Sequence, residues 1–158
     1  MGFAANVKSL FGLGNDSYTE FPWRYPVDMS YPAILNASGS GDVDPADSGN
    51  DSYNLNIEWA TVNTPFADPI VDLPGVYKIS LRSTSGSAQT ADITPRKMQL
   101  FELIQGDTCS WTATDNSDDS LIASGTAEVD FDLLITIPGV PMLTGDGTLL
   151  EIDNCQNL

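Results

Sequence analysis

Alternation of apolar and polar residues with a period of two dominates the chain from Tyr53 onward. Because successive side chains of a strand point to opposite faces, this pattern predicts half-buried strands. The segments that show it are residues 54–59, 77–82, 109–114, 127–137 and 148–153. Residues 98–104 are apolar on both faces, which predicts a central strand. No long helical pattern competes, so we predict an all-β fold, an antiparallel immunoglobulin-like β-sandwich.

The register of these strands predicts the core, because a strand buries one of its two faces. The longest predicted strand points its apolar side chains one way, and these are Val129, Phe131, Leu133, Ile135 and Ile137. Asp130 and Asp132 point the other way, and we interpret them as an exposed polar face rather than a glycosidase carboxylate pair. The residues expected to be buried together are Trp59, Leu81, Phe101, Trp111, Phe131 and Ile135.

The chain divides into three regions by composition. Residues 1–35 form an N-terminal arm and an aromatic, Pro-punctuated strap, residues 36–52 form an acidic flexible loop, and residues 53–158 form the sandwich domain. The first 14 residues carry Phe3, Val7, Leu10 and Phe11 at helical spacing, which predicts a short amphipathic helix. The aromatics Trp23, Tyr25 and Tyr31 of the strap form either a platform for a sugar or a partner chain or, as we favour, a cover on the core.

Three short segments carry a resemblance to a known family. They are Gly75-Val-Tyr-Lys-Ile-Ser-Leu, Gly106-Asp-Thr-Cys-Ser-Trp-Thr-Ala and Ser124-Gly-Thr-Ala-Glu-Val-Asp. Residues 75–153, about half the chain, resemble an immunoglobulin-like or fibronectin-type module. The resemblance implies a module of the kind attached to secreted hydrolases, surface proteins and phage particles. The chain departs from an immunoglobulin domain in that Trp111 follows Cys109 by two residues, and likeness of fold transfers no active site.

The charge and residue composition exclude several classes of function. The 158 residues include 22 Asp and Glu, six Lys and Arg, and no His, for a formal net charge of −16. The chain therefore lacks the commonest catalytic base, and no Gly-x-Ser-x-Gly elbow is present. Two adjacent cations, Arg96 and Lys97, do not make a nucleic-acid site. No apolar run is long enough to span a membrane, and residues 1–14 do not read as a secretory signal.

Acidic residues and cysteines leave two questions open. The loop residues Asp42, Asp44, Asp47 and Asp51 offer the oxygen ligands that calcium prefers, but without EF-hand spacing, and we favour a solvated linker. A second cluster lies between two predicted strands, where a plain turn is expected, and consists of Asp115, Asn116, Asp118 and Asp119. Cys109 and Cys155 are compatible with one disulfide bond or with two reduced thiols.

These observations favour a binding or structural role over an enzyme. We expect a non-enzymatic subunit of a large surface assembly, most simply a virion (phage) decoration or capsid-associated protein, located on a virion or an extracellular surface. Its partners would be copies of itself or other subunits, with no cofactor, nucleic acid or membrane. The residues expected to contact neighbouring subunits are Phe3, Val7, Leu10, Phe11, Trp23, Tyr25 and Tyr31. The alternative is a carbohydrate-binding or accessory module associated with a secreted hydrolase.

Overall fold

The computed structural model describes residues 30–39, 56–62 and 64–157, and within these ranges the chain forms strands and no helix. The strands are β1 (Tyr31–Leu35), β2 (Ile57–Trp59), β3 (Val71–Leu73), β4 (Val76–Ser83), β5 (Gln89–Arg96), β6 (Thr108–Asp115), β7 (Leu121–Glu128), β8 (Ile137–Met142) and β9 (Thr148–Gln156). The predicted all-β fold is therefore confirmed.

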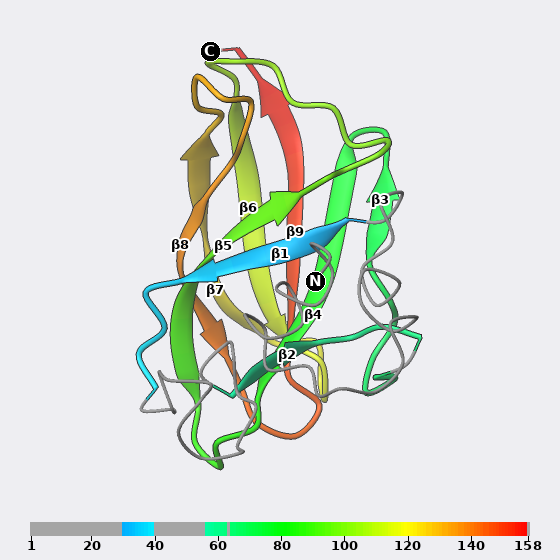
Figure 1. The fold of residues 1–158 in the computed structure, drawn as a ribbon, viewed down its shortest axis with the longest axis vertical. Helices are drawn as coiled ribbons and strands as arrows, with labels where there is room; N and C mark the ends of the chain where they lie inside the picture. Colours follow the sequence, from blue (N-terminus) through cyan, green and yellow to red (C-terminus); the bar gives the residue numbers. More distant parts are fainter. Residues whose placement is uncertain (1–29, 40–55, 63, 158) are drawn as a thin grey trace, which may run out of the picture.

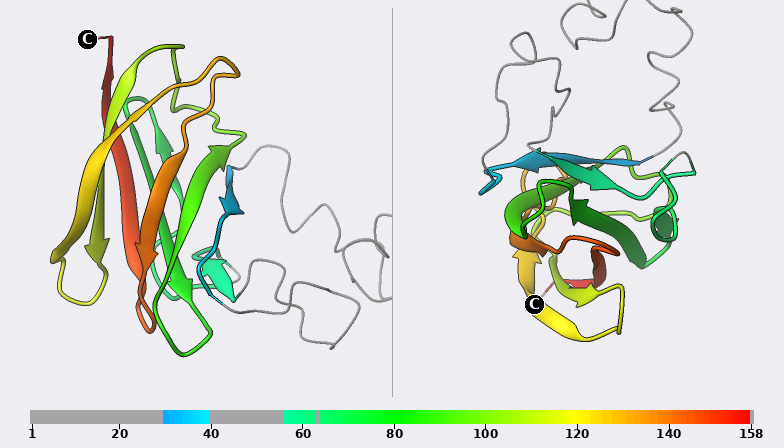
Figure 2. Two further views of the ribbon diagram at one scale, coloured as in Figure 1. Left: turned by 90° about the vertical axis from the view of Figure 1, so that its left-hand side faces the viewer. Right: turned by 90° about the horizontal axis from the view of Figure 1, so that it is seen from below.

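The strands form two antiparallel sheets that pack against each other (Figure 1). One sheet has the order β1-β5-β8, and the other has the order β2-β4-β9-β6-β7, with β3 also paired to β4. The short strands β3 and β2 share one edge of β4, because β3 pairs with Val76–Lys78 and β2 pairs with Leu81–Ser83. Figure 2 shows the two layers from the side, with β7 at the outer edge of the larger sheet.

The core lies between the sheets and confirms the period-two register of β4 and β6. Tyr77, Ile79 and Leu81 of β4 are at most 1% exposed. On β6, Cys109, Trp111 and Ala113 are buried while the residues between them are half-buried. The opposite sheet contributes Ala91, Ile93, Ile137, Val140 and Met142 to the same cluster. Trp59 packs against this cluster and is partly buried.

The end of the aromatic strap belongs to the sandwich. Tyr31 begins β1, which pairs along its whole length with β5. Tyr31 is half-buried and Ile34 packs against the core, as expected for a segment that covers the sandwich. The fold therefore includes residues 31–35, which the composition of the chain had placed in the N-terminal region.

Asp92 joins all three strands of the smaller sheet. It lies on β5 at a shift in the register between β5 and β8. Its carboxylate accepts a hydrogen bond of 2.7 Å from the Asn36 side chain after β1 and one of 2.8 Å from the Gly139 N–H of β8. These donors favour the charged carboxylate, so the hydrogen bond from Asn36 and then that from Gly139 hold the pKa of Asp92 below its ordinary value.

The strand predicted at residues 98–104 is absent, and Asp72 explains why. The Asp72 carboxylate accepts hydrogen bonds from three consecutive backbone N–H groups, those of Gln99, Leu100 and Phe101. In a strand, successive N–H groups point to opposite edges, so one carboxylate cannot bind three of them. The segment instead turns over the end of the sandwich. Phe101 is buried as predicted, while Leu100 is exposed.

The predicted strand at residues 127–137 is interrupted by a turn. β7 ends at Glu128, an isolated bridge joins Val129 to Ile135, and β8 starts at Ile137 in the other sheet. The Asp130 carboxylate accepts hydrogen bonds from the N–H groups of Asp132 and Leu134, which closes the turn. The core prediction is thus right for Val129, Ile135 and Ile137, which are buried, and wrong for Phe131 and Leu133, which are exposed.

A disulfide bond joins Cys109 on β6 to Cys155 on β9. These strands are neighbours in the larger sheet, and the two cysteines are 46 residues apart in the sequence. The bridge lies near the start of β6 and the end of β9, so it ties both strands at one end of the sandwich. Of the two arrangements that the sequence allowed, the structure has the bridged one.

Candidate interaction surface

Two turns lie side by side at the end of the sandwich where β9 finishes. The first turn is closed by a hydrogen bond from the Asp107 N–H to the Ile104 carbonyl. The second turn spans residues 130–134 between β7 and β8. Hydrogen bonds from Gly106 to Val129 and from Val129 to Asp107 bind the two turns together. Both loops are visible at the upper end of the molecule in Figure 1.

These turns display large apolar side chains to solvent. Phe131 is 81% exposed, Ile104 is 65% exposed and Leu133 is 52% exposed. We call these three residues the apolar end. Single exposed apolar residues are common on protein surfaces, but three on two hydrogen-bonded turns form a candidate contact site. The sequence pattern assigned Phe131 and Leu133 to the core, so it did not identify this surface.

The turn that carries Phe131 is held in one conformation. Besides the two hydrogen bonds accepted by the Asp130 carboxylate, the Asp130 N–H donates to the Leu134 carbonyl at 2.8 Å. Leu133 has a φ angle of 58°, in the left-handed region that non-glycine residues seldom adopt. A residue stays in that region only where its surroundings fix it, so the turn presents Phe131 with little freedom to collapse onto the protein.

Exposed carboxylates lie on and beside the two turns. Glu102 and Asp132 are exposed on the same two connections, and Glu128 is exposed at the end of β7. Asp130 is also exposed, although its carboxylate is engaged in the turn. The surface therefore combines an apolar centre with a negative rim, which suits a partner that presents an apolar pocket near positive charge.

Asp130 and Asp132 are not a catalytic pair on a strand face. They lie in the turn rather than on a strand, and the Asp130 carboxylate accepts the Asp132 backbone N–H at 2.9 Å. The sequence placed both residues on the exposed polar face of a strand. Both are exposed, as predicted, but they lie in a turn and not in a strand.

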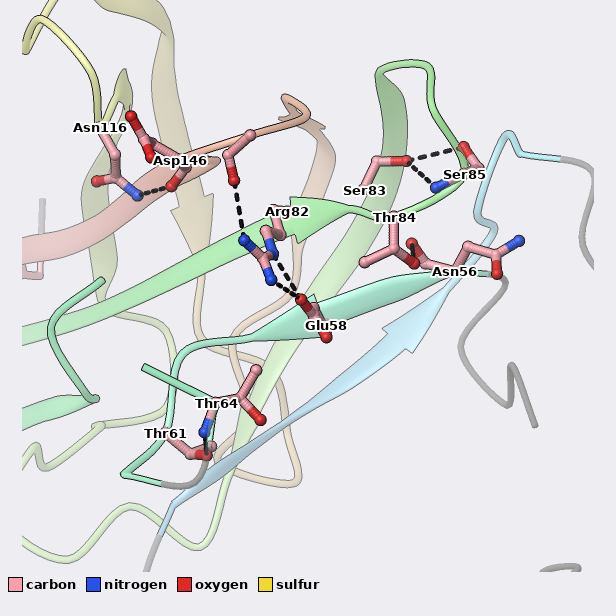
Figure 3. A network of polar contacts seen from close by, with 11 residues as sticks. Asn56, Glu58, Thr61, Thr64, Arg82, Ser83, Thr84, Ser85, Asn116 and Asp146 are labelled. Atoms are coloured by element: carbon pink, nitrogen blue, oxygen red, sulfur yellow. Dashed lines mark hydrogen bonds and ion pairs between the residues drawn. The ribbon is translucent and has the colours of Figure 1, made fainter. Parts of the chain in front are cut away.

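The second acidic cluster forms a turn, as the sequence predicted. The Asp115 carboxylate accepts hydrogen bonds from the N–H and hydroxyl of Ser117, at 2.7 and 2.6 Å. Asn116 donates from its side chain to the Asp146 carbonyl, which ties this turn to the β8–β9 connection (Figure 3). The described ranges contain no group of three or more His, Cys, Asp or Glu arranged to hold a metal ion.

Two cations of the larger sheet are engaged in ion pairs. Arg82 of β4 binds Glu58 of β2 through two nitrogens and donates to the Gly145 carbonyl (Figure 3). Its guanidinium also lies 4.2 Å from the centre of the Phe66 ring. Lys78 pairs with Glu151 on β9 at 2.9 Å. These contacts fasten neighbouring strands and leave neither cation available as part of a basic patch.

Tyr77 is an ionisable residue buried in the core, and its role is structural. Burial raises the pKa of its hydroxyl well above the ordinary value, so the group stays protonated. The hydroxyl hydrogen-bonds to Ser30 at 2.8 Å, and Ser30 in turn donates to the Arg96 carbonyl at 2.7 Å. Tyr77 therefore anchors the residue before β1 to the core and has no features of a nucleophile.

Most of the interaction and metal residues predicted from the sequence lie outside the described ranges. These are Phe3, Val7, Leu10, Phe11, Trp23 and Tyr25, and the loop residues Asp42, Asp44, Asp47 and Asp51. Tyr31 alone of that set is described, and its place in β1 leaves it half-buried.

Comparison with known protein families, with curated proteins and with solved structures found no match to this chain. The part of the chain that the structure describes has no helix long and apolar enough to cross a membrane.

Proposed function

We propose that this chain is a non-enzymatic interaction protein, an immunoglobulin-like β-sandwich subunit of a large surface assembly such as a virion decoration or capsid-associated protein. The observation that carries the proposal is the apolar end, where a fixed turn holds Phe131 81% exposed. Aromatic side chains are enriched at binding hot spots because they bury a large area at little entropic cost.

Burial of the apolar end would release enough free energy to stabilise a specific contact with a partner. Complete burial of one large apolar side chain contributes about 1.5–3 kcal/mol, and the apolar end offers three that are partly or largely exposed. The net charge of −16 makes copies of the chain repel one another at other surfaces. An apolar contact that outweighs this repulsion would select one geometry of association.

The N-terminal region supplies a second proposed contact. Phe3, Val7, Leu10 and Phe11 make an apolar stripe too short for a helix that is stable alone in water. Such a stripe needs a surface on which to fold, and a neighbouring subunit would provide it. Trp23 and Tyr25 add aromatic residues to the same region.

The test is incorporation of variants into the native assembly. Phe131→Ser should leave the melting temperature unchanged and should reduce the fraction of the protein that co-sediments with high-mass particles from its source. Val62→Ser, in the connection after β2, is the matched control because Val62 is 75% exposed outside the apolar end. Equal incorporation of both variants, or recovery of the native protein only as a free monomer, would refute the proposal.

A second candidate function has one observation in its favour. Disulfide bonds persist mainly in oxidising environments, so the bridge between Cys109 and Cys155 suits a secreted carbohydrate-binding or accessory module. The proposed sugar platform would use Trp23, Tyr25 and Tyr31. Screening the full chain against a glycan array tests this candidate, and specific binding that is lost in Trp23→Ala would favour it over the assembly subunit.

A further inference from the structure

The outer edge of β7 is open to another strand. β7 is the last strand of the larger sheet, and β6 is the strand that pairs with it. Its eight residues, Leu121–Glu128, are exposed or half-buried throughout. Within the described residues, no backbone hydrogen bond outside the β6–β7 ladder involves residues 121–128. An edge of this kind presents unpaired backbone donors and acceptors.

The other three sheet edges carry features that discourage strand pairing. β1 contains Pro32, and β8 contains Pro138 and Pro141, which lack the N–H needed for a ladder. The remaining edge is divided between β2 and β3, each only three residues long. β7 has no Pro, no Lys and no Arg, and its middle is small and uncharged. The contrast singles out β7 as the edge suited to pairing.

We infer that β7 binds an extended segment of another protein, which adds a strand to the larger sheet. The segment would have an uncharged stretch of about eight residues, to match the length of β7, with Lys or Arg at both ends. This inference concerns the backbone edge of β7, which shares only the carboxylates Glu128 and Asp130 with the rim of the apolar end, and it does not depend on the proposed function.

Charge at the two ends of β7 determines the kind of segment. Asp118 and Asp119 precede the strand, and Glu128 and Asp130 close it, all of them exposed. Between these clusters β7 carries no charge from Leu121 to Ala127. A segment with cations at both ends would therefore meet carboxylates at both ends, whichever way it ran. A second copy of β7 would bring further carboxylates, which the net charge of −16 disfavours.

Trp111 adds a second observation at the same edge. Its indole crosses from β6 over Gly125 of β7, where a Cβ atom would lie 3.0 Å from Nε1. Trp111 is only 8% exposed, and its Nε1–H has no hydrogen-bond acceptor among the described residues. The indole therefore packs against the middle of β7, and its N–H signal would report a strand added beside Gly125, because such a strand would lie only about 4.8 Å from β7.

The experiment uses the full chain and two synthetic peptides. Both contain eight alternating Thr and Val residues, flanked by two Lys at each end in one peptide and by two Glu in the other. Titration followed by amide NMR should show binding of the Lys-flanked peptide, with the largest shifts at β7 and at the Trp111 indole N–H. The Glu-flanked peptide should bind about tenfold more weakly or not at all, and added salt should weaken the Lys-flanked complex.

Proline variants test whether the backbone edge is the binding element. Adjacent residues of a strand direct their N–H groups to opposite edges, so either Ala123→Pro or Ser124→Pro removes an outward N–H and spares the ladder with β6. The variant that keeps the higher melting temperature should lose the peptide. Ser110→Thr on β6, which leaves both edges of β7 intact, should bind like the unmodified chain.

Several outcomes would overturn the inference. Absence of binding by the Lys-flanked peptide, equal binding of both peptides, or shifts centred away from β7 would each do so. Retention of the peptide by the folded proline variant would show that the backbone edge is not used. Concentration-dependent dimerisation through β7 without peptide binding would identify a second copy as the occupant and would equally refute a cationic partner strand.

Discussion

Phe101 and Phe131 provide the sharpest test of the fold, because the sequence pattern assigned both to the core and the structure separates them. Phe101 is 3% exposed, and its ring centre lies 6.1 Å from that of Tyr77. Phe131 is 81% exposed in the turn between β7 and β8. Replacing each by Ala removes the same atoms from two opposite environments.

The two alanine substitutions should lower the free energy of unfolding by amounts that differ several-fold. Phe101→Ala should lower the free energy of unfolding by about 3–5 kcal/mol, since it removes buried contacts and leaves a cavity. At about 3 °C per kcal/mol for a chain of this size, its melting temperature should fall by roughly 9–15 °C. Phe131→Ala should change the free energy of unfolding by about 0.5 kcal/mol or less, because an exposed ring loses little on truncation.

Urea unfolding followed by circular dichroism measures both changes, and differential scanning calorimetry measures the melting temperatures. Phe101→Leu is a graded control that should fall between the unmodified protein and Phe101→Ala. Equal destabilisation by the two alanine variants would show that the register after Val129 is wrong. A larger effect at Phe131 would restore the uninterrupted strand that the sequence pattern predicts.

Four further predictions follow from the rest of the molecule. Reduction of the disulfide should lower the free energy of unfolding by about 4 kcal/mol, as chemical denaturation with and without reductant would show, because the bridge closes a loop of 46 residues. The hydrogen bond from Asn36, followed by that from Gly139, lowers the pKa of Asp92, so the stability from this group is present above its unfolded pKa and is lost as the pH falls through the folded pKa. In Asp92→Asn, the free energy of unfolding should therefore fall less steeply as the pH is lowered, as urea unfolding at a series of pH values would show. An unchanged fall at low pH would contradict this assignment. Deleting residues 1–14 should leave a folded, soluble sandwich that no longer enters its assembly, whereas unfolding would place the arm in the core. Chelation of calcium should leave the melting temperature unchanged if residues 36–52 are a solvated linker, and a fall that calcium reverses would establish a site there.

Period-two alternation was a reliable guide where a strand has one buried and one solvated face. In β4 and β6 every residue that the pattern assigned to the core is buried, but Ser80, which it placed on the polar face of β4, is buried as well. The turn before β9 carries Gly145 and Gly147, whose φ angles of 67° and 79° favour glycine.

The strands predicted at residues 98–104 and 127–137 were wrong for the same reason, which the pattern of apolar residues cannot reveal. In each, a single carboxylate binds several backbone N–H groups and bends the chain. Asp130 lies within the bent segment and is followed closely by its donors, so its local turn could have been suspected from the sequence. Asp72 lies 27 residues before Gln99, and that pairing exists only once the fold brings β3 beside the later segment.

The candidate sites were harder to anticipate than the fold. The apolar end consists of residues whose hydrophobicity made them look like core, and exposure is a property of the tertiary structure rather than of residue type. The edge of β7 depends on strand order, which places this strand last in its sheet. The disulfide depended on β6 and β9 being neighbours, which residue spacing alone does not determine.

The disulfide also has a mechanical consequence. β7 and β8, with nearly all of β6 and β9, lie inside the covalent loop that runs from Cys109 to Cys155. Tension applied between residues before Cys109 and residues after Cys155 passes through the sulfur atoms and bypasses this loop. Extending 46 residues would release roughly 150 Å of chain, so the oxidised domain should lengthen by about that much less than the reduced one when it is pulled apart. The bridge thus acts as a stop that limits how far a stretched domain can unravel.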